Sequence, residues 1–277
     1  MPFAPKLPAH GAEIPAIGFG TSGMGDVRAE HIAIALKAGY RHIDTAWKYR
    51  TERAVGEGIR ASGVPRQEIF LCTKVSHEYL HADDFARSVD ESLEKLGVDY
   101  VDLLLVHWPE KNTPLAETMA ALAKAKRQGL ARHIGVANFN IAMLDEAIKF
   151  CPEPLVTLQA ECHPYLDQTR VIEACHKRGL VLTAYCPLAR GRLIGDPVLA
   201  DIARRKGKTV AHVALRWLMQ QKIIAAIPRS SNAARIAQNI DVFDFELSDD
   251  EMARIKALAR PDGRTANPAG RAPKWDV

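Results

Sequence analysis

The regular alternation of short apolar runs with stretches of helical period constrains the fold of this 277-residue chain more than any other feature. The apolar runs are rich in β-branched residues, which is typical of strands. Segments such as 82–97, with an apolar residue every third or fourth position, separate them. Eight runs are present, at 14–20, 41–45, 69–75, 101–107, 131–137, 155–161, 180–186 and 223–228. This alternation predicts a parallel sheet with crossover helices.

Eight such units predict an α/β fold, the closed (β/α)8 TIM barrel, with a doubly wound open sheet as the alternative. The longer gap before the eighth run leaves room for an extra segment near 195–206. Because no linker or composition shift divides the chain, we expect a single domain over 1–277. Pro and Gly content predicts loops at both ends, with 1–13 as an N-terminal floor segment and 261–277 as a C-terminal loop over the mouth.

Composition and charge exclude several classes of protein. The formal net charge is only +4, and Lys and Arg are scattered, whereas a nucleic-acid-binding protein usually gathers them on one face. Five cysteines without a C-x-x-C pair argue against a disulfide framework and against a zinc site, and favour a reducing compartment. No signal peptide or membrane span is evident. We expect a cytoplasmic protein that binds no metal, and nothing demands more than a monomer.

The stretch "IGFGTSGMGD" places Gly18, Gly20 and Gly23 in the spacing G-x-G-x-x-G, with Asp44 about 20 residues further on. This is the outline of a dinucleotide-binding fingerprint. A central strand resists Pro15, however, and two of the glycines fall within the predicted strand itself. We therefore expect these glycines to permit a tight corner and close approach of a ligand, and a nucleotide to bind near the other end of the chain.

Four polar residues fall where the second, third and fourth predicted strands end: Asp44, Tyr49, Lys74 and His107. In a barrel these carboxyl ends surround the active site. Each residue alone has a plainer explanation, as a helix cap or as a satisfied core or rim residue. Their convergence on one rim favours a catalytic site.

The chemistry of this set is coherent. A phenol with a pKa near 10 is a poor acid at neutral pH, and a nearby ammonium lowers that pKa by about 1 to 3 units. A carboxylate keeps the ammonium charged, and an imidazole directs a substrate carbonyl towards the phenol. The set predicts proton donation to a carbonyl oxygen as a hydride reaches the carbon.

Seven motifs, in order, resemble the aldo-keto reductase family from about residue 6 to the end of the chain: "GYRHIDTAWKY", "CTKV", "DLLLVHWP", "IGVANFN", "ECHPYLDQ", "AYCPLARG" and "IPRSSNAARIAQN". The stretches "SGVPRQEIF" and "PAGRAPKWD" are most similar to the bacterial 2,5-diketo-D-gluconate reductase subgroup, whose relatives also reduce methylglyoxal. The resemblance implies NADPH as hydride source. It also implies a tetrad of Asp44, Tyr49, Lys74 and His107, with Tyr49 as the acid.

The resemblance further implies that the cofactor lies over the barrel mouth with its adenosine phosphate beside the last strand. Arg229 and Ser230 would meet the 2′-phosphate, Arg235 the phosphate and adenine, and Gln238 and Asn239 the adenine. Taken alone, this segment is equally compatible with a capped helix that carries solvated arginines. The other implied cofactor contacts are Asn138 and Gln159 at the carboxamide, Tyr185 on the ring, and the backbone of Gly20, Thr21 and Leu188.

Several positions depart from the family pattern. Ala137 replaces a serine, which removes one hydrogen bond to the carboxamide, and Arg229 replaces a common lysine, which affects the choice between NADPH and NADH. Lys48 either attracts an anionic substrate or points into solvent. The predicted substrate pocket consists of Ser22 and Ser76, where many eukaryotic relatives have tryptophan, with Trp47 and Trp108.

The sequence thus favours an NADPH-dependent reductase of small aldehydes, ketoaldehydes or keto-sugar acids. One alternative is a lyase that uses Lys74 as a Schiff-base nucleophile on the same barrel. A second is an NADPH-binding sensor or scaffold without significant turnover.

Overall fold

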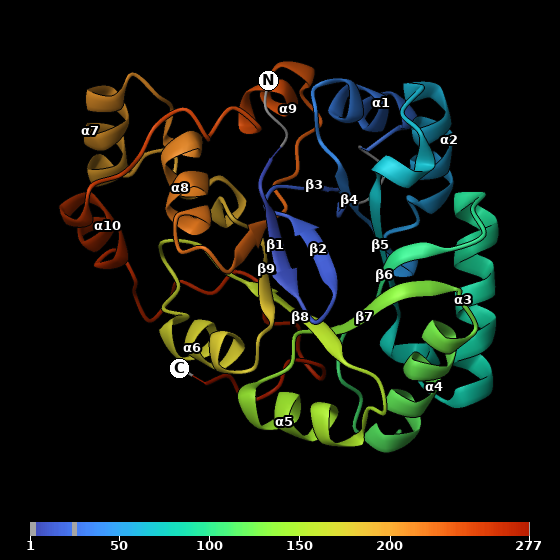
Figure 1. The fold of residues 1–277 in the computed structure, drawn as a ribbon. Coiled ribbons are helices and arrows are strands. Elements are labelled where there is room, and N and C mark those ends of the chain that lie inside the picture. The colour runs from blue at the N-terminus through green and yellow to red at the C-terminus, as the bar shows by residue number, and fades with distance from the viewer. Residues whose placement is uncertain (1–3, 24–26, 277) are drawn as a thin grey trace.

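The computed structural model describes residues 4–23 and 27–276, and its main sheet contains eight parallel strands. Their order in the sheet follows their order in the chain, as crossover helices between parallel neighbours require (Figure 1). The strands are β3 (Phe19–Gly20), β4 (His42–Asp44), β5 (Phe70–Val75), β6 (Val101–Val106), β7 (Ala131–Ala137), β8 (Leu155–Glu161), β9 (Val181–Tyr185) and β10 (Ile224–Ala226).

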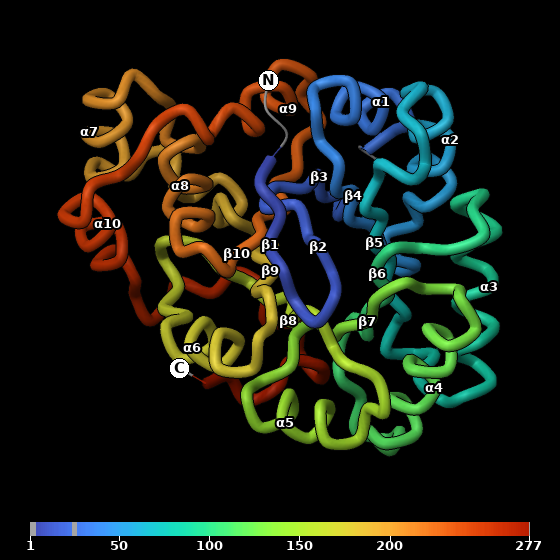
Figure 2. The backbone as a smooth tube through the Cα atoms, in the orientation of Figure 1, coloured from blue at the N-terminus to red at the C-terminus, as the bar shows by residue number. Residues whose placement is uncertain are grey.

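Backbone hydrogen bonds join the first and last strands and close the sheet into a barrel. The amide of Gly18 donates to the carbonyl of Ala226 at 2.8 Å, the amide of Ala226 to Ala16 at 2.9 Å, and that of Gly20 to Pro228 at 3.0 Å. The tube in Figure 2 shows the resulting ring. The predicted barrel is confirmed, and the open sheet is wrong.

Helices surround the ring because each has one apolar face. α3 is representative: Phe85, Val89, Leu93 and Leu96 are buried, while charged residues cover its outer side. The helices are α1 (Ala29–Lys37), α2 (Glu52–Ser62), α3 (Ala82–Leu96), α4 (Leu115–Arg127), α5 (Ile141–Phe150), α6 (Thr169–Lys177), α7 (Pro197–Lys206), α8 (Val210–Met219), α9 (Ala233–Asn239) and α10 (Asp249–Lys256). α7 is the extra segment expected before the last strand.

The first predicted strand, 14–20, is wrong as a continuous element. Its beginning belongs to an N-terminal hairpin of β1 (Lys6–Ala9) and β2 (Ala12–Pro15), and only Phe19–Gly20 forms a strand of the barrel. Pro15, which cannot donate to a ladder, ends the hairpin strand. The residues expected to form loops at the N-terminus therefore form an antiparallel pair instead.

The hairpin lies across one end of the barrel (Figure 1). Ala9, Ala12 and Ile14 are buried in a cluster with side chains from most strands of the ring, among them Leu103 and Val156. These strand residues point inward, so the hairpin fills the interior at the amino ends of the strands. The opposite end, where the strands finish, stays available for polar side chains.

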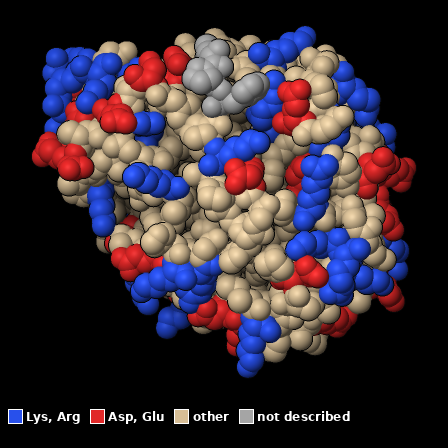
Figure 3. Space-filling view, in the orientation of Figure 1, with Lys and Arg blue, Asp and Glu red and all other residues tan. Residues whose placement is uncertain are grey.

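The surface agrees with the modest net charge. On the face shown in Figure 3, acidic and basic side chains are interspersed. Within residues 4–23 and 27–276, no helix combines the length and the apolar character that a membrane crossing needs.

Candidate active site

A buried ion pair lies at the centre of the barrel mouth. Lys74, near the end of β5, is 0% exposed, and Asp44, the last residue of β4, is 2% exposed. The Nζ of Lys74 donates to Oδ1 of Asp44 at 2.6 Å and to the carbonyl of Thr45 at 2.7 Å. Burial alone would lower the pKa of Lys74, but the adjacent Asp44 carboxylate outweighs it and raises that pKa. Lys74 is therefore a fixed, fully charged ammonium.

Tyr49 ends a short 3-10 helix, Trp47–Tyr49, in the loop after β4, and lies above this pair. The Nζ of Lys74 is 5.0 Å from the centre of its ring. Its hydroxyl lies 3.5 Å from Nε2 of His107. The structure thus brings together the four residues singled out in the sequence.

The acidity of Tyr49 differs from the expectation. We predicted a lowered pKa, whereas burial raises the pKa of the phenol by more than the Lys74 charge lowers it. The prediction of a net decrease is wrong, because it considered the cation and not the loss of water around the ring. At neutral pH the phenol is protonated, which is the form that a proton donor requires.

His107 follows β6 and is a neutral imidazole. Burial, followed by the positive charges of Lys74 and Arg271, holds the pKa of His107 well below its usual value. Its backbone is fixed on both sides: the amide donates to the Val75 carbonyl at 3.0 Å, and the carbonyl accepts from Nδ2 of Asn138 at 2.8 Å. A neutral ring fixed in this way can donate one hydrogen bond towards the mouth.

The two predicted carboxamide ligands bond to groups of the site. Nε2 of Gln159 donates to Oδ2 of Asp44 at 2.8 Å, and Oδ1 of Asn138 accepts from the Tyr185 hydroxyl at 2.7 Å. Asn138 has a left-handed backbone, with φ of 64°. Strain of this kind at a non-glycine residue is typical of functional sites.

The three glycines of the G-x-G-x-x-G spacing lie where neighbouring segments of the barrel leave no room for a side chain. A Cβ atom on Gly18 would lie 2.7 Å from the His42 ring, and one on Gly20 would lie 2.8 Å from the carbonyl oxygen of Ile227. One on Gly23 would lie 2.8 Å from the guanidinium carbon of Arg229. Gly18 and Gly20 therefore allow close contact with the neighbouring strand and with the end of the last strand. Gly23 leaves room for the Arg229 side chain against the loop after β3.

The remaining residues of the predicted nucleotide segment lie between β10 and the end of α9. Asn232 caps α9 by accepting from the amide of Arg235 at 3.0 Å, and the Ser230 hydroxyl accepts from the amide of Asn232 at 3.1 Å. Arg229 and Arg235 are exposed. Gln238 is exposed at the end of α9, whereas Asn239 is buried. The segment presents guanidinium, hydroxyl and backbone groups at a helix start, a donor set that suits a phosphate.

The cofactor contacts predicted through backbone lie at the end of β3 and in the loops after β3 and β9, the two strands that flank β10 in the ring. The amide of Thr21 donates to the Asp44 carbonyl at 3.0 Å, which holds the loop after β3 beside the tetrad. Leu188 follows β9 and is partly buried against the core.

Of the predicted pocket residues, two have their polar groups engaged by neighbours. The Ser76 hydroxyl donates to Glu78 at 2.9 Å, and the Trp47 indole donates to Glu91 on α3 at 3.0 Å. Lys48 forms an ion pair with Glu78 at 2.7 Å, so its side chain has a partner of opposite charge.

The ring centres of Trp108 and of Trp275, in the C-terminal segment, are 6.2 Å apart, and the two rings meet edge to face. Trp275 and Glu161 lie inside two of the quoted stretches, but the motif pattern assigns a role to neither. Their importance depends on contacts between distant segments, which motif spacing does not encode.

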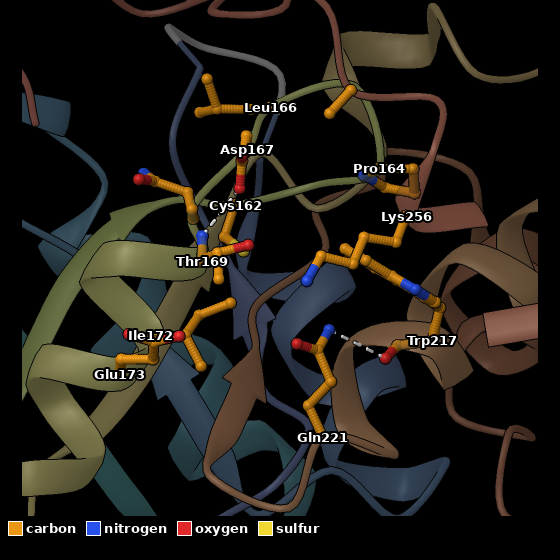
Figure 4. Close-up of a pocket in the computed structure, with 12 residues that line it drawn as sticks. Cys162, Pro164, Leu166, Asp167, Thr169, Ile172, Glu173, Trp217, Gln221 and Lys256 are labelled. Atoms are coloured by element: carbon orange, nitrogen blue, oxygen red, sulfur yellow. Dashed lines mark hydrogen bonds between the residues drawn. The ribbon is translucent and has the colours of Figure 1, made fainter. Parts of the chain in front are cut away.

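A cavity of about 230 Å³ lies away from this site, between α6, α8 and α10 (Figure 4). Its wall includes Ile172, Trp217 and Lys256, and contains none of the tetrad. Across the part of the chain that the structure describes, no group of three His, Cys, Asp or Glu residues could hold a metal ion. All five cysteines are free thiols.

Comparison with known proteins agrees with this geometry. The Aldo/keto reductase family model matches residues 16–260. The chain is 40% identical over 261 residues to the glyoxal reductase of Bacillus subtilis, covering 94% of each chain. It is 40% identical over 267 residues to methylglyoxal reductase DkgB of Escherichia coli O157:H7, covering 95% of this chain and 99% of that protein.

Solved structures give the same answer. A crystal structure provisionally named 2,5-diketo-D-gluconic acid reductase B is 45% identical with a TM-score of 0.95, covering 99% of this chain and 98% of the other. The aldo-keto reductase of Bombyx mori, solved in complex with NADP, is 34% identical with a TM-score of 0.87 over 94% of each chain. By its barrel, by the family match over most of its length and by these relatives, the chain belongs to the aldo/keto reductase family.

Proposed function

We propose that this protein reduces small aldehydes, ketoaldehydes or keto-sugar acids to alcohols with NADPH, and that Tyr49 donates the proton. The observation that carries the proposal is the meeting of a protonated phenol, a buried ammonium and a neutral imidazole at the barrel mouth. The similarity to a glyoxal reductase and a methylglyoxal reductase supports small dicarbonyl compounds as substrates.

Each tetrad residue has one task in this proposal. His107 donates a hydrogen bond to the carbonyl oxygen and holds it near the phenol. Tyr49 gives its proton to that oxygen, and the ammonium of Lys74 stabilises the phenolate that remains. Asp44 keeps the ammonium charged and in place through the 2.6 Å contact.

The residues present also fit the cofactor. When bound, NADPH supplies the hydride. We propose that Arg229, Ser230 and Arg235 hold its 2′-phosphate, because two guanidiniums and a hydroxyl near the capped start of α9 make a donor set that suits an anion. Gln238 and Asn239 would contact the adenine, and Tyr185, Asn138 and Gln159 the nicotinamide end. Gly20, Thr21 and Leu188 would line the path between them, and Ser22, Trp47, Ser76 and Trp108 the substrate pocket.

The lyase alternative is disfavoured by the charge on Lys74. A Schiff base requires a neutral amine, whereas the Asp44 contact raises the pKa of Lys74. Borohydride in the presence of a carbonyl substrate should therefore leave no adduct on this residue. The sensor or scaffold alternative predicts NADPH binding without oxidation across a broad panel of aldehydes.

The test is the substitution Tyr49→Phe, which removes the acid and keeps the ring. We expect NADPH oxidation with methylglyoxal and a panel of aldehydes to fall by about 10² to 10⁴ in rate. Turnover is followed at the absorbance of the reduced nicotinamide, with NADPH and NADH compared side by side. Tyr100→Phe is the matched control, since Tyr100 precedes β6 at the other end of the barrel and pairs with Arg132. Full activity in Tyr49→Phe would refute the assignment.

A further inference from the structure

The carboxylate of Glu161 is an anchor for the C-terminal segment. Glu161 ends β8 and is 0% exposed. It accepts hydrogen bonds from the amide of Thr265 at 2.7 Å, from the amide of Ala266 at 2.9 Å, and from the Thr265 hydroxyl. Nε2 of His163 lies 3.0 Å from the same carboxylate. Three of these four contacts therefore tie one strand end to a segment more than 100 residues away in sequence.

A second set of contacts continues from this anchor to the catalytic region. The guanidinium of Arg264 lies 3.8 Å from Glu161 and 3.9 Å from the centre of the Trp275 ring. Trp275 in turn meets the edge of Trp108, the residue after His107. The charge of Glu161 thus orients Arg264, and Arg264 supports an aromatic surface beside the mouth.

The far end of the segment is held by more exposed contacts. Nδ2 of Asn140 donates to the Lys274 carbonyl at 2.9 Å, and Arg170 donates to the Asp276 carbonyl at 2.7 Å. Exposed contacts contribute little because water competes for them, whereas hydrogen bonds to a buried carboxylate contribute more. The contacts that this segment makes with the most buried partner are therefore those of Thr265 and Ala266 with Glu161.

We propose that Glu161 is a positioning residue that holds residues 264–276 across the barrel mouth, so that Trp275 completes the wall of the substrate pocket at Trp108. It determines affinity for the carbonyl substrate and leaves hydride and proton transfer unchanged. The kinetic part of this inference rests on the proposed function, whereas the structural part does not.

The experiment uses the full chain in three variants. Glu161→Gln removes the charge, Thr265→Val removes one hydroxyl donor without changing the shape of the side chain, and Glu146→Gln is the matched control on the exposed surface of α5. Trypsin cleavage after Arg264, Arg271 and Lys274 is followed by mass spectrometry without substrate. KM and kcat for methylglyoxal and for a larger aromatic aldehyde are then measured at saturating NADPH.

We expect cleavage of the segment to accelerate and KM to rise about tenfold in Glu161→Gln, with smaller changes in Thr265→Val. kcat should stay within about twofold, because the lost contacts act equally on bound substrate and transition state. The control should match the wild type. If Glu161→Gln does not fold, Thr265→Val carries the test.

Unchanged cleavage and unchanged KM in an active protein would overturn the inference, and so would a loss of kcat at constant KM. The proposed function would instead be refuted if the wild-type protein failed to oxidise NADPH with every carbonyl compound tested. The cleavage rates would then still test the anchor by themselves.

Discussion

Lys74 is a full charge placed among apolar strand residues, and its surroundings explain how the barrel tolerates it. Removing a charge from water costs several kcal/mol unless partners satisfy it. Asp44 supplies the opposite charge and the Thr45 carbonyl a further acceptor. Gln159 bonds to the remaining carboxylate oxygen, so the pair is satisfied on both sides. The same arrangement fixes the position of the positive charge that acts on the Tyr49 phenol.

The low pKa of His107 leads to a prediction about pH. Since burial and the Lys74 charge disfavour the imidazolium, His107 stays neutral as the pH falls through about 6.5, the ordinary value for histidine. We expect kcat/KM for carbonyl reduction to show no loss with a midpoint near that pH. The measurement is a pH–rate profile from about pH 5.5 to 8 at saturating NADPH. A midpoint near 6.5 that disappears in His107→Asn would contradict the neutral ring.

Single residues also show the limit of reading a sequence. The tetrad could be predicted because each member stands at the carboxyl end of a predicted strand or, for Tyr49, in the loop that follows it, and the barrel brings these ends together. The raised pKa of Tyr49 could not, because it depends on how much water the folded mouth excludes. The bond between Gln159 and Asp44 likewise depends on a distance across the ring.

Among the helices, α2 and α3 pack unusually closely at one point. A Cβ atom on Gly56 of α2 would lie 2.0 Å from the carbonyl oxygen of Leu96, the last residue of α3. Backbone cannot move aside as a flexible side chain can, so only glycine fits between these helices.

We therefore expect Gly56→Ala to lower the free energy of unfolding by about 1 to 3 kcal/mol, despite the better helix propensity of alanine. Gly195→Ala is the control, because a Cβ atom there meets nothing within 4 Å. It should change stability by less than about 0.5 kcal/mol. Urea denaturation followed by circular dichroism measures both. Equal stability of the two variants would show that the helices can separate without cost.

The strands illustrate why most elements were predictable and one was not. β7 and β8 coincide with their predicted ranges, because a buried parallel strand is a continuous apolar run bounded by turns. The run at 14–20 is equally apolar, but its first residues pair in the N-terminal hairpin and its last residues pair in the barrel. Apolar character shows that a segment is buried, and it does not show which neighbour it pairs with.

At the scale of the whole molecule, the exposed surface determines whether copies of the chain associate. Among the described residues, the large hydrophobic side chains that are exposed are Ile148, Phe150 and Ile194. Two belong to the end of α5 and the third to the loop before α7, so they do not form a broad apolar patch of the kind that marks stable interfaces.

We expect sedimentation equilibrium to give a mass near 30.5 kDa at micromolar protein concentration. The mass should not change when salt is raised, because the face shown in Figure 3 carries charges of both signs, interspersed. A mass near twice this value would contradict the prediction and show that two copies of the chain associate.

The closure of the ring by residues 16–20 and 226–228 has a consequence for synthesis on the ribosome. The first strand of the barrel cannot meet its second neighbour until more than 200 further residues have been translated and have left the exit tunnel. Pairing between such distant segments is slow, and the edges wait unpaired in the meantime. The nascent chain therefore has an open sheet with unpaired edges, which are prone to aggregation, until the last strand is available. We expect its dependence on chaperones to be highest just before that strand emerges.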